Sequence, residues 1–306
     1  MKRTRFPADR GLSARMMFTL FILGLLFVGF VAALWALRVP IVLVGLIAVA
    51  VLAAQYWFAD RIAMFSMGAR LVTPAEAPEL HAIVDRLCAL ADLPKPKVAI
   101  AESDIPNAFA TGRNQRAAVV AVTTGLLARL DDAEVEAVLA HELSHVAHRD
   151  VAVMTAASLL GLLAGLLTRF IFYAGFFGGF GEGDRDEENN SGLVFIAVLA
   201  VSALVYVLSF LLTRALSRYR ELAADRGAAI VTGAPATLAA ALVKVTGEMG
   251  RIPTRDLRAA EAMNAFFFAP ALAPGLSLSS LLSTHPSLER RLEQLSRLQN
   301  EMGSPA

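Results

Sequence analysis

Four long apolar runs constrain the fold of this 306-residue chain more than any other feature. Residues 17–37, 39–59 and 193–213 each form a run of 21 residues without a charge, and residues 151–168 form a run of 18. A helix needs roughly 20 apolar residues to cross a bilayer core, so we expect four transmembrane helices. The alternative is burial in a soluble core, which is most plausible for the short third run.

Composition supports a membrane protein. Charged residues make up 18% of the chain, whereas soluble globular proteins have roughly 25%. The formal net charge of +1 provides no overall field to attract nucleic acid, and we expect no nucleic-acid partner. Cys88 is the single cysteine, which excludes an internal disulfide and a cluster of several thiolates around zinc.

The distribution of charge predicts the orientation. Residues 1–15 carry five basic side chains and one acid, whereas residues 178–192 carry five acids and one arginine. Three arginines follow the last run, and short basic flanks stay on the cytoplasmic side. We therefore expect both termini in the cytoplasm. The predicted divisions are residues 1–59 (basic segment and first membrane pair), 60–150, 151–213 (second pair with an acidic external loop) and 214–306.

The two segments outside the runs predict a mixed α and β region in the cytoplasm. Strand-like sequences occupy residues 97–101, 107–111 and 117–123, which predicts a small sheet with at least one hairpin. We expect helices opened by Thr73-Pro74, by Asp131 with Glu134 at capping-box spacing, and by Pro286. Two more are expected over residues 213–232 and from Pro235. The apolar residues 265–282, rich in Pro, Gly and Ser, predict a loop.

The helix opened by Asp131 contains His141-Glu142-Leu143-Ser144-His145, the H-E-x-x-H pattern. Histidines four residues apart lie on one helical face, about 6 Å apart along the axis, so both can reach one zinc ion. Glu142 is offset from the first histidine and can accept a proton from a water molecule that the metal activates. The alternative to a zinc site is an ordinary amphipathic helix that carries two histidines.

A catalytic zinc site needs a third protein ligand. His148 is about 10.5 Å along the helix from His141, too far to share the ion. Glu221 and Asp225 lie four residues apart after the fourth run. Glu221 can ligate the metal, while Asp225 can accept a ring N–H from a ligand histidine and orient it. The alternative is a solvated acid pair among arginines.

Together these motifs resemble the HtpX-type integral-membrane zinc metallopeptidases, which are related to the prenyl-protein endopeptidases of the endoplasmic reticulum. The resemblance covers nearly the whole chain and rests on the opening hydrophobic hairpin and on residues 107–112, 141–145, 218–225 and 284–286. It implies a gluzincin-type peptidase with one Zn²⁺ held by His141, His145 and Glu221.

The resemblance also implies a function and three further roles. It implies Glu142 as the catalytic base, a bacterial inner-membrane location and cleavage of misfolded membrane proteins in quality control, with stress-response expression. Asn107 would lie in the edge strand on which a substrate peptide pairs. His285 would approach the site and stabilise the oxyanion.

Three alternatives to this function stay open. An inactive membrane scaffold of the same fold would lack stoichiometric zinc. A prenyl-protein processing peptidase is less favoured, because that branch of the family has more than four spans. A transporter should line a path with polar residues inside its spans, whereas three of the runs here are long and uncharged. The sequence predicts neither the oligomeric state nor the cleavage preference.

Overall fold

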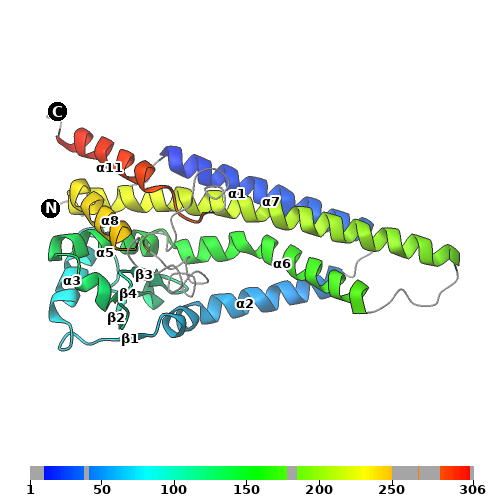
Figure 1. Cartoon of the computed structure of the whole chain (residues 1–306), viewed down its shortest axis with the longest axis horizontal. Helices are drawn as coiled ribbons and strands as arrows, with labels where there is room; N and C mark the ends of the chain where they lie inside the picture. The colour runs from blue at the N-terminus through cyan, green and yellow to red at the C-terminus, as the bar shows by residue number, and fades with distance from the viewer. Residues whose placement is uncertain (1–9, 38–40, 178–184, 250–267, 269–282, 304–306) are drawn as a thin grey trace.

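The computed structural model describes residues 10–37, 41–177, 185–249, 268 and 283–303. Long helices lie side by side at one end of the molecule, and a mixed α and β region lies at the other (Figure 1). The long helices are α1 (Arg10–Ala36), α2 (Ile41–Ser66), α6 (Asp150–Phe177) and α7 (Arg185–Thr232). The shorter helices are α3 (Pro78–Ala91), α4 (Thr124–Leu127), α5 (Asp132–Ala147), α8 (Pro235–Met249) and α11 (Leu288–Gly303), with a 3₁₀ turn at Gln115–Ala117.

Three of the described helices are long and apolar enough to cross a membrane, as predicted. These spans are Ser13–Ala36, Asp150–Arg169 and Gly192–Thr232, so the short third run meets the requirement. The second predicted run lies in α2, where the described residues give only the apolar stretch Val49–Phe58, so α2 is not counted with these three spans. A fourth crossing therefore stays a prediction.

Helix α7 extends well beyond the bilayer. Its 48 residues correspond to about 72 Å at 1.5 Å per residue, against a hydrocarbon core of about 30 Å. The prediction of a separate helix over residues 213–232 is wrong, because the apolar run continues into this segment as one unbroken helix. Gly233, at φ +69°, follows the last turn in the left-handed conformation that glycine adopts freely. One rigid helix thus links the membrane bundle to the α and β region.

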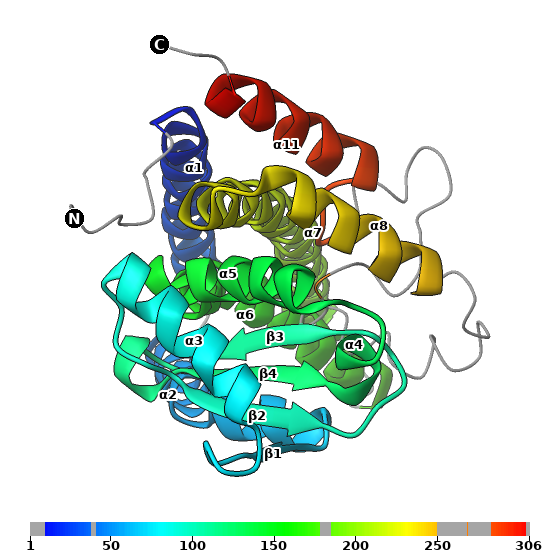
Figure 2. The ribbon, with the colours of Figure 1, turned by 90° about the vertical axis from the view of Figure 1, so that its left-hand side faces the viewer.

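The sheet has four strands in the order β1-β2-β4-β3. They are β1 (Ala69–Leu71), β2 (Lys97–Ala101), β3 (Ala108–Thr111) and β4 (Val119–Thr123). β3 and β4 form the predicted antiparallel hairpin, and β2 pairs parallel to β4 from Lys97↔Val119 to Ala101↔Thr123. The short edge strand β1, which pairs antiparallel to β2, was not predicted. β3 forms the opposite edge, beside α5 (Figure 2).

Two predicted helix starts shift. α3 begins at Pro78 rather than Pro74, because Glu76 folds back and accepts hydrogen bonds from the N–H and the hydroxyl of Thr73 at 2.7 and 2.8 Å. This bonding makes the Thr73–Glu76 stretch a turn that precedes the helix. The last helix begins at Leu288, two residues after Pro286. Of the predicted loop 265–282, only Phe268 lies within the described residues.

The apolar core of the α and β region draws on both halves of the chain. Val84, Val122 and Leu139 from the first half pack in one cluster with Leu242 and Leu295 from the second. A separate cluster within the membrane bundle joins α1, α6 and α7. Burial of apolar surface is the main stabilising force, so neither half has a complete core alone. The segments before and after the α6–α7 pair therefore fold against each other.

Candidate metal centre and active site

Helix α5 carries the H-E-x-x-H residues and has a well-defined start. The side chain of Asp131 accepts from the Glu134 N–H at 2.9 Å, and Glu134 accepts in return from the Asp131 N–H at 3.1 Å, completing the predicted capping box. Two turns on, His141 and His145 share one face, with their Nε2 atoms 3.2 Å apart. The helical repeat thus brings two metal-ligand atoms to one point.

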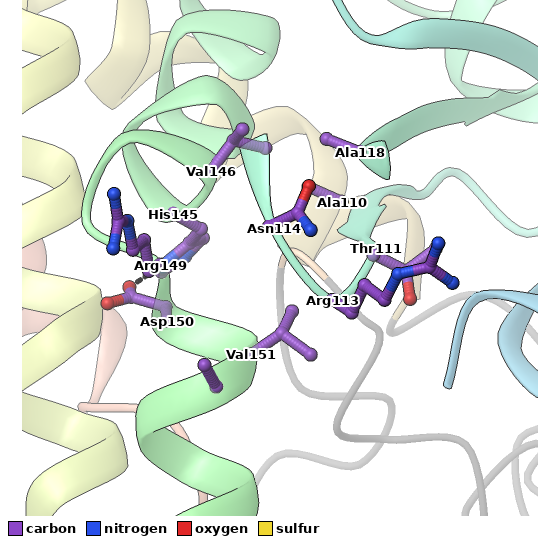
Figure 3. Close-up of a pocket in the computed structure, with 12 residues that line it drawn as sticks. Ala110, Thr111, Arg113, Asn114, Ala118, His145, Val146, Arg149, Asp150 and Val151 are labelled. Atoms are coloured by element: carbon purple, nitrogen blue, oxygen red, sulfur yellow. Dashed lines mark hydrogen bonds and ion pairs between the residues drawn. The ribbon is translucent and has the colours of Figure 1, made fainter. Parts of the chain in front are cut away.

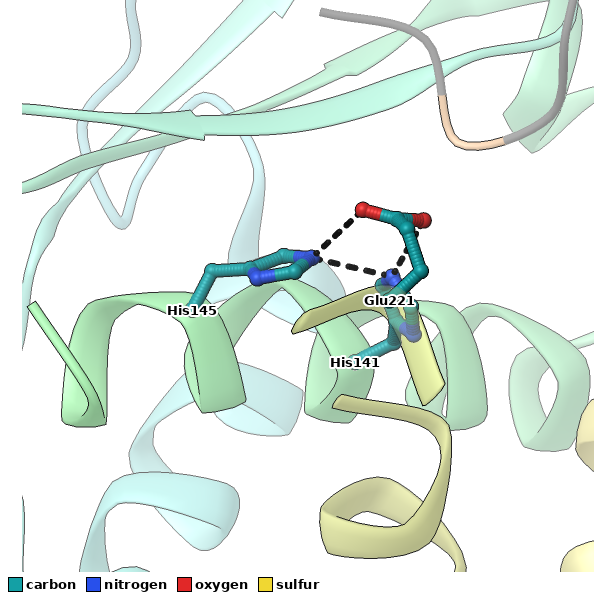
Figure 4. Close-up of side chains that lie close together, drawn as sticks. All are labelled: His141, His145 and Glu221. Carbon is teal, nitrogen blue, oxygen red and sulfur yellow. Dashed lines mark hydrogen bonds and ion pairs between the residues drawn. The ribbon is translucent and has the colours of Figure 1, made fainter. Parts of the chain in front are cut away.

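Helix α7 brings Glu221 to the same point (Figure 4). Its Oε1 lies 3.4 Å from His145 Nε2, and its Oε2 lies 3.7 Å from His141 Nε2. One ligand atom from each of the three residues lies within 4.8 Å of the others. Two imidazoles and one carboxylate are a donor set that suits zinc in catalytic sites. His148, excluded on distance, does not belong to this group.

Both histidines have a carboxylate at the second ring nitrogen. His141 Nδ1 lies 2.9 Å from Asp225 Oδ1, and His145 Nδ1 lies 2.6 Å from Asp150 Oδ2. A carboxylate at Nδ1 favours the tautomer that carries its proton there and leaves Nε2 as the donor atom for a metal. Both Nε2 atoms face Glu221, so the arrangement fits a zinc ion.

Each of these carboxylates is paired with a buried arginine. Asp225 receives two hydrogen bonds from Arg291 of α11, from Nε at 2.7 Å and from Nη2 at 2.6 Å. Arg220 Nη2 lies 2.7 Å from Asp150 Oδ2. Buried carboxylates need such partners, because an unpaired charge in the interior is costly. The two pairs connect the metal group to α11 and to the start of α6.

Sequence reasoning found Asp225 but missed three members of this network. Asp150 could have been noticed, since it stands five residues after His145 and directly before an uncharged run that a lipid-facing acid would avoid. Arg220 and Arg291 gave no such signal, because each stands beside other charged residues on a helix. Only the folded chain shows which arginines are buried.

The pKa values of the histidines reflect their carboxylate partners. Burial by itself lowers the pKa of His145, but Asp150 and Glu221 outweigh burial and raise it to about 10. Burial also lowers the pKa of His141, but Asp225 and Glu221 outweigh this effect and raise the pKa above its ordinary value. A proton and a metal ion therefore compete for the same nitrogen atoms.

Glu142 lies beside the ligand group without belonging to it. Its side chain is buried, and burial raises the pKa of its carboxyl group above the ordinary value. It lines a cavity of about 530 Å³ together with His141, His145 and Glu221. A buried carboxylate with a raised pKa, next to a metal site and open to a cavity, is suited to accept and return a proton.

This cavity extends in two directions from the metal group. On one side β3, the edge strand, lines it with residues 108–111. On the other side it reaches the membrane-spanning helices at Val151, Met154 and Ser158 of α6 and Ser217 of α7. The cavity therefore lies between the edge strand β3 and the start of the bundle.

The two remaining predicted site residues have different surroundings. His285 lines the cavity, and its Nδ1 lies 2.9 Å from Glu221 Oε2. Asn107 is fully buried directly before β3, and its Oδ1 accepts from the Phe268 N–H at 2.8 Å. Asn107 is not among the residues that line the cavity. The structure thus places His285 at the ligand group. Asn107 instead bonds to the main chain of Phe268 and does not line the cavity.

A second, smaller cavity is lined by His145 and by the β3–β4 turn (Figure 3). Its volume of about 20 Å³ is near the room that one water molecule needs. Arg113 and Asn114 of the turn line it, together with Arg149 and Asp150 at the α5–α6 corner. It is too small for a substrate, and we assign it no ligand.

An apolar helical bundle joined to an α and β region with two histidines and a glutamate at one point defines a membrane metallopeptidase. The profile of Peptidase family M48 matches residues 74–299, and the chain belongs to this family. It is accordingly a zinc-dependent membrane metalloprotease.

Individual relatives agree over almost the full length. The chain is 61% identical to Protease HtpX homolog 1 of Streptomyces coelicolor over 98% of this chain and 97% of that protein. It is 56% identical to Protease HtpX homolog of Moorella thermoacetica, with 98% of each chain covered. The crystal structure of S. mikatae Ste24p shares the fold, with a TM-score of 0.53 at 19% identity over 94% of this chain and 67% of that one.

Proposed function

We propose that this protein is a four-span endopeptidase of the bacterial inner membrane that hydrolyses misfolded or damaged membrane proteins on the cytoplasmic side. The observation that carries the proposal is the cavity that joins the edge of β3, the His141–His145–Glu221 group and the start of the membrane bundle. In the proposal, residues 60–150 and 214–306 form one cytoplasmic domain, separated in sequence by the second membrane pair. The basic N-terminal segment and the acidic 178–192 segment support this orientation.

In the proposed site, His141, His145 and Glu221 hold one zinc ion, and Asp225 and Asp150 orient the two histidines. A bound zinc ion supplies Lewis acidity towards water and the scissile carbonyl. Glu142 accepts the proton of the attacking water and returns it to the leaving amine nitrogen, so no covalent acyl-enzyme is needed. His285, on the cavity wall, stabilises the oxyanion that develops on the carbonyl.

The proposed substrate pairs as an extended strand along β3, the edge strand of the described sheet. Main-chain hydrogen bonds would hold it with little sequence preference, which suits an enzyme that removes damaged proteins. Residues 108–111 line the same cavity as the three proposed zinc ligands. Asn107, the predicted substrate-binding residue, would contribute at the start of this strand, where its main chain bonds to Thr123 in β4.

Metal analysis of the full chain purified in detergent tests the proposal, combined with degradation of an unfolded protein with and without a chelator. We expect one zinc ion per chain and proteolysis that stops with the chelator and returns with zinc. A folded protein without stoichiometric zinc would favour the inactive scaffold instead.

Orientation needs a separate test. Reporter fusions after residue 187 and after residue 306 should report an external and a cytoplasmic location, respectively. The reverse pattern would overturn the topology and leave the chemistry untouched.

A further inference from the structure

The main chain of Phe268 is held from both sides by buried side chains. Its N–H donates to Asn107 Oδ1, and its carbonyl accepts from Arg291 Nη1, each at 2.8 Å. Asn107 precedes β3, Arg291 belongs to α11, and all three residues are at most 2% exposed. A buried peptide group is normally satisfied by secondary structure, whereas this one depends on two side chains from distant parts of the sequence.

The Phe268 ring, held in this way, packs against a zinc ligand. Its centroid lies 5.1 Å from that of His141, and the two ring planes meet at 88°, an edge-to-face contact. The Arg291 guanidinium carbon lies 5.1 Å from the centroid of the same phenyl ring. Phe268 thus forms an apolar wall between His141 and the buried arginine.

Arg291 closes the network. Besides the Phe268 carbonyl, it binds both carboxylate oxygens of Asp225, and Asp225 Oδ1 lies 2.9 Å from His141 Nδ1. The His141 imidazole therefore has the Asp225 carboxylate beside its Nδ1 atom and the Phe268 ring against its own ring, and Arg291 binds both of these residues. Asn107 supplies the remaining fixed point, because it holds the Phe268 N–H.

We infer that Asn107 and Arg291 are positioning residues that hold the Phe268 ring against His141 and so set the geometry of the zinc site. The inference rests on the proposed role of His141 as a zinc ligand. It gives Asn107 a task distinct from contact with substrate: its side chain faces Phe268, and its main chain starts the strand on which the substrate would pair. One residue then connects the position of that strand edge to the position of the metal.

Two single variants and their combination test this inference in the full-length chain. Asn107→Ala removes the acceptor for the Phe268 N–H but keeps the phenyl ring. Phe268→Leu keeps both main-chain hydrogen bonds and most of the apolar volume but removes the aromatic edge. The readouts are zinc affinity by chelator competition, the visible absorption bands of the cobalt-loaded protein, and the unfolding temperature of the metal-free protein.

We expect each single variant to bind zinc about 10–100-fold more weakly, the loss typical of residues that orient metal ligands, and to alter the cobalt bands. The double variant should bind zinc no more weakly than whichever single variant has the lower zinc affinity, because both changes act through the same ring. Two controls should bind zinc like the wild type. Asn114→Ala removes another asparagine that accepts from main-chain N–H groups, and Phe30→Leu alters an equally buried phenylalanine of the membrane bundle.

The outcomes separate this inference from the proposed function. A wild-type protein that binds no zinc would refute the proposed function itself. Normal zinc binding by the wild type, with affinity and cobalt bands unchanged in Phe268→Leu, would refute the positioning role alone. Additive losses in the double variant would also refute it. If Asn107→Ala does not fold, Phe268→Leu decides the question, since it leaves the main-chain contacts in place.

Discussion

Glu142→Gln separates proton transfer from metal binding. The amide has nearly the shape of the carboxylate but cannot accept the proton of the attacking water. The three proposed ligand atoms lie within 4.8 Å of one another, and Glu142 contributes none of them. We therefore expect the variant to keep one zinc ion per chain and to lose proteolysis.

The expected loss follows from the surroundings of the carboxylate. Positioned general bases contribute about 10²–10⁴-fold to the rate, or about 3–5 kcal/mol of activation free energy at 1.36 kcal/mol per factor of ten. Glu142 is 5% exposed and lines the cavity beside the proposed ligands, which is where a general base is needed. A loss of at least this order is expected, and self-cleavage in detergent, if it occurs, should stop as well.

The assay measures degradation of an unfolded protein alongside zinc content. Glu136→Gln is the matched control, because it makes the same substitution on the same helix, where Glu136 pairs with Arg86 at the surface. That control should retain near wild-type activity. Normal zinc with near-normal proteolysis in Glu142→Gln would refute the mechanism. Loss of zinc would show that Glu142 has a structural role and leave the base unidentified.

Three further predictions concern the metal site, the packing of α6 against α7, and the reactivity of Cys88. Glu221→Ala should lose zinc, and Asp225→Ala should bind it roughly 10–100-fold more weakly; full zinc occupancy in Glu221→Ala would place the third ligand elsewhere. A Cβ at Gly165 of α6 would lie 3.1 Å from a tyrosine ring of α7, so Gly165→Leu should destabilise the bundle by about 1–3 kcal/mol in thermal unfolding, whereas Gly29→Leu, with nothing within 4 Å, should not. Burial raises the pKa of Cys88 to about 11, so iodoacetamide should alkylate it slowly at pH 8 in the folded protein and readily after unfolding.

Local patterns were sufficient for much of the chemistry. The spacing of His141 and His145 brings their ring nitrogens together through the helical repeat alone, and the Asp131 cap marks where that helix begins. Three of the four apolar runs correspond to helices long and apolar enough to cross a membrane, because the required length is set by bilayer thickness. The strand over residues 97–101 was predicted to the residue. These features depend on neighbours within a few residues.

Other features needed the tertiary structure, because they depend on contacts between residues far apart in the chain. A separate helix was expected over 213–232, yet α7 is continuous from the bilayer to Thr232 and carries Glu221 to the histidines as part of one rigid element. The parallel pairing of β2 with β4 could not be read from the alternation of side chains, because alternation does not identify the partner strand.

The supporting network shows the same division most clearly. The sequence by itself determined that two histidines, a glutamate and a general base could meet in a membrane protein. Only the tertiary structure decided that Asp150 faces His145, that Arg291 of α11 is buried against Asp225, and that Asn107 holds Phe268. Burial decides whether an arginine is a solvated surface charge or a fixed partner of a carboxylate, and burial results from the packing of the whole chain.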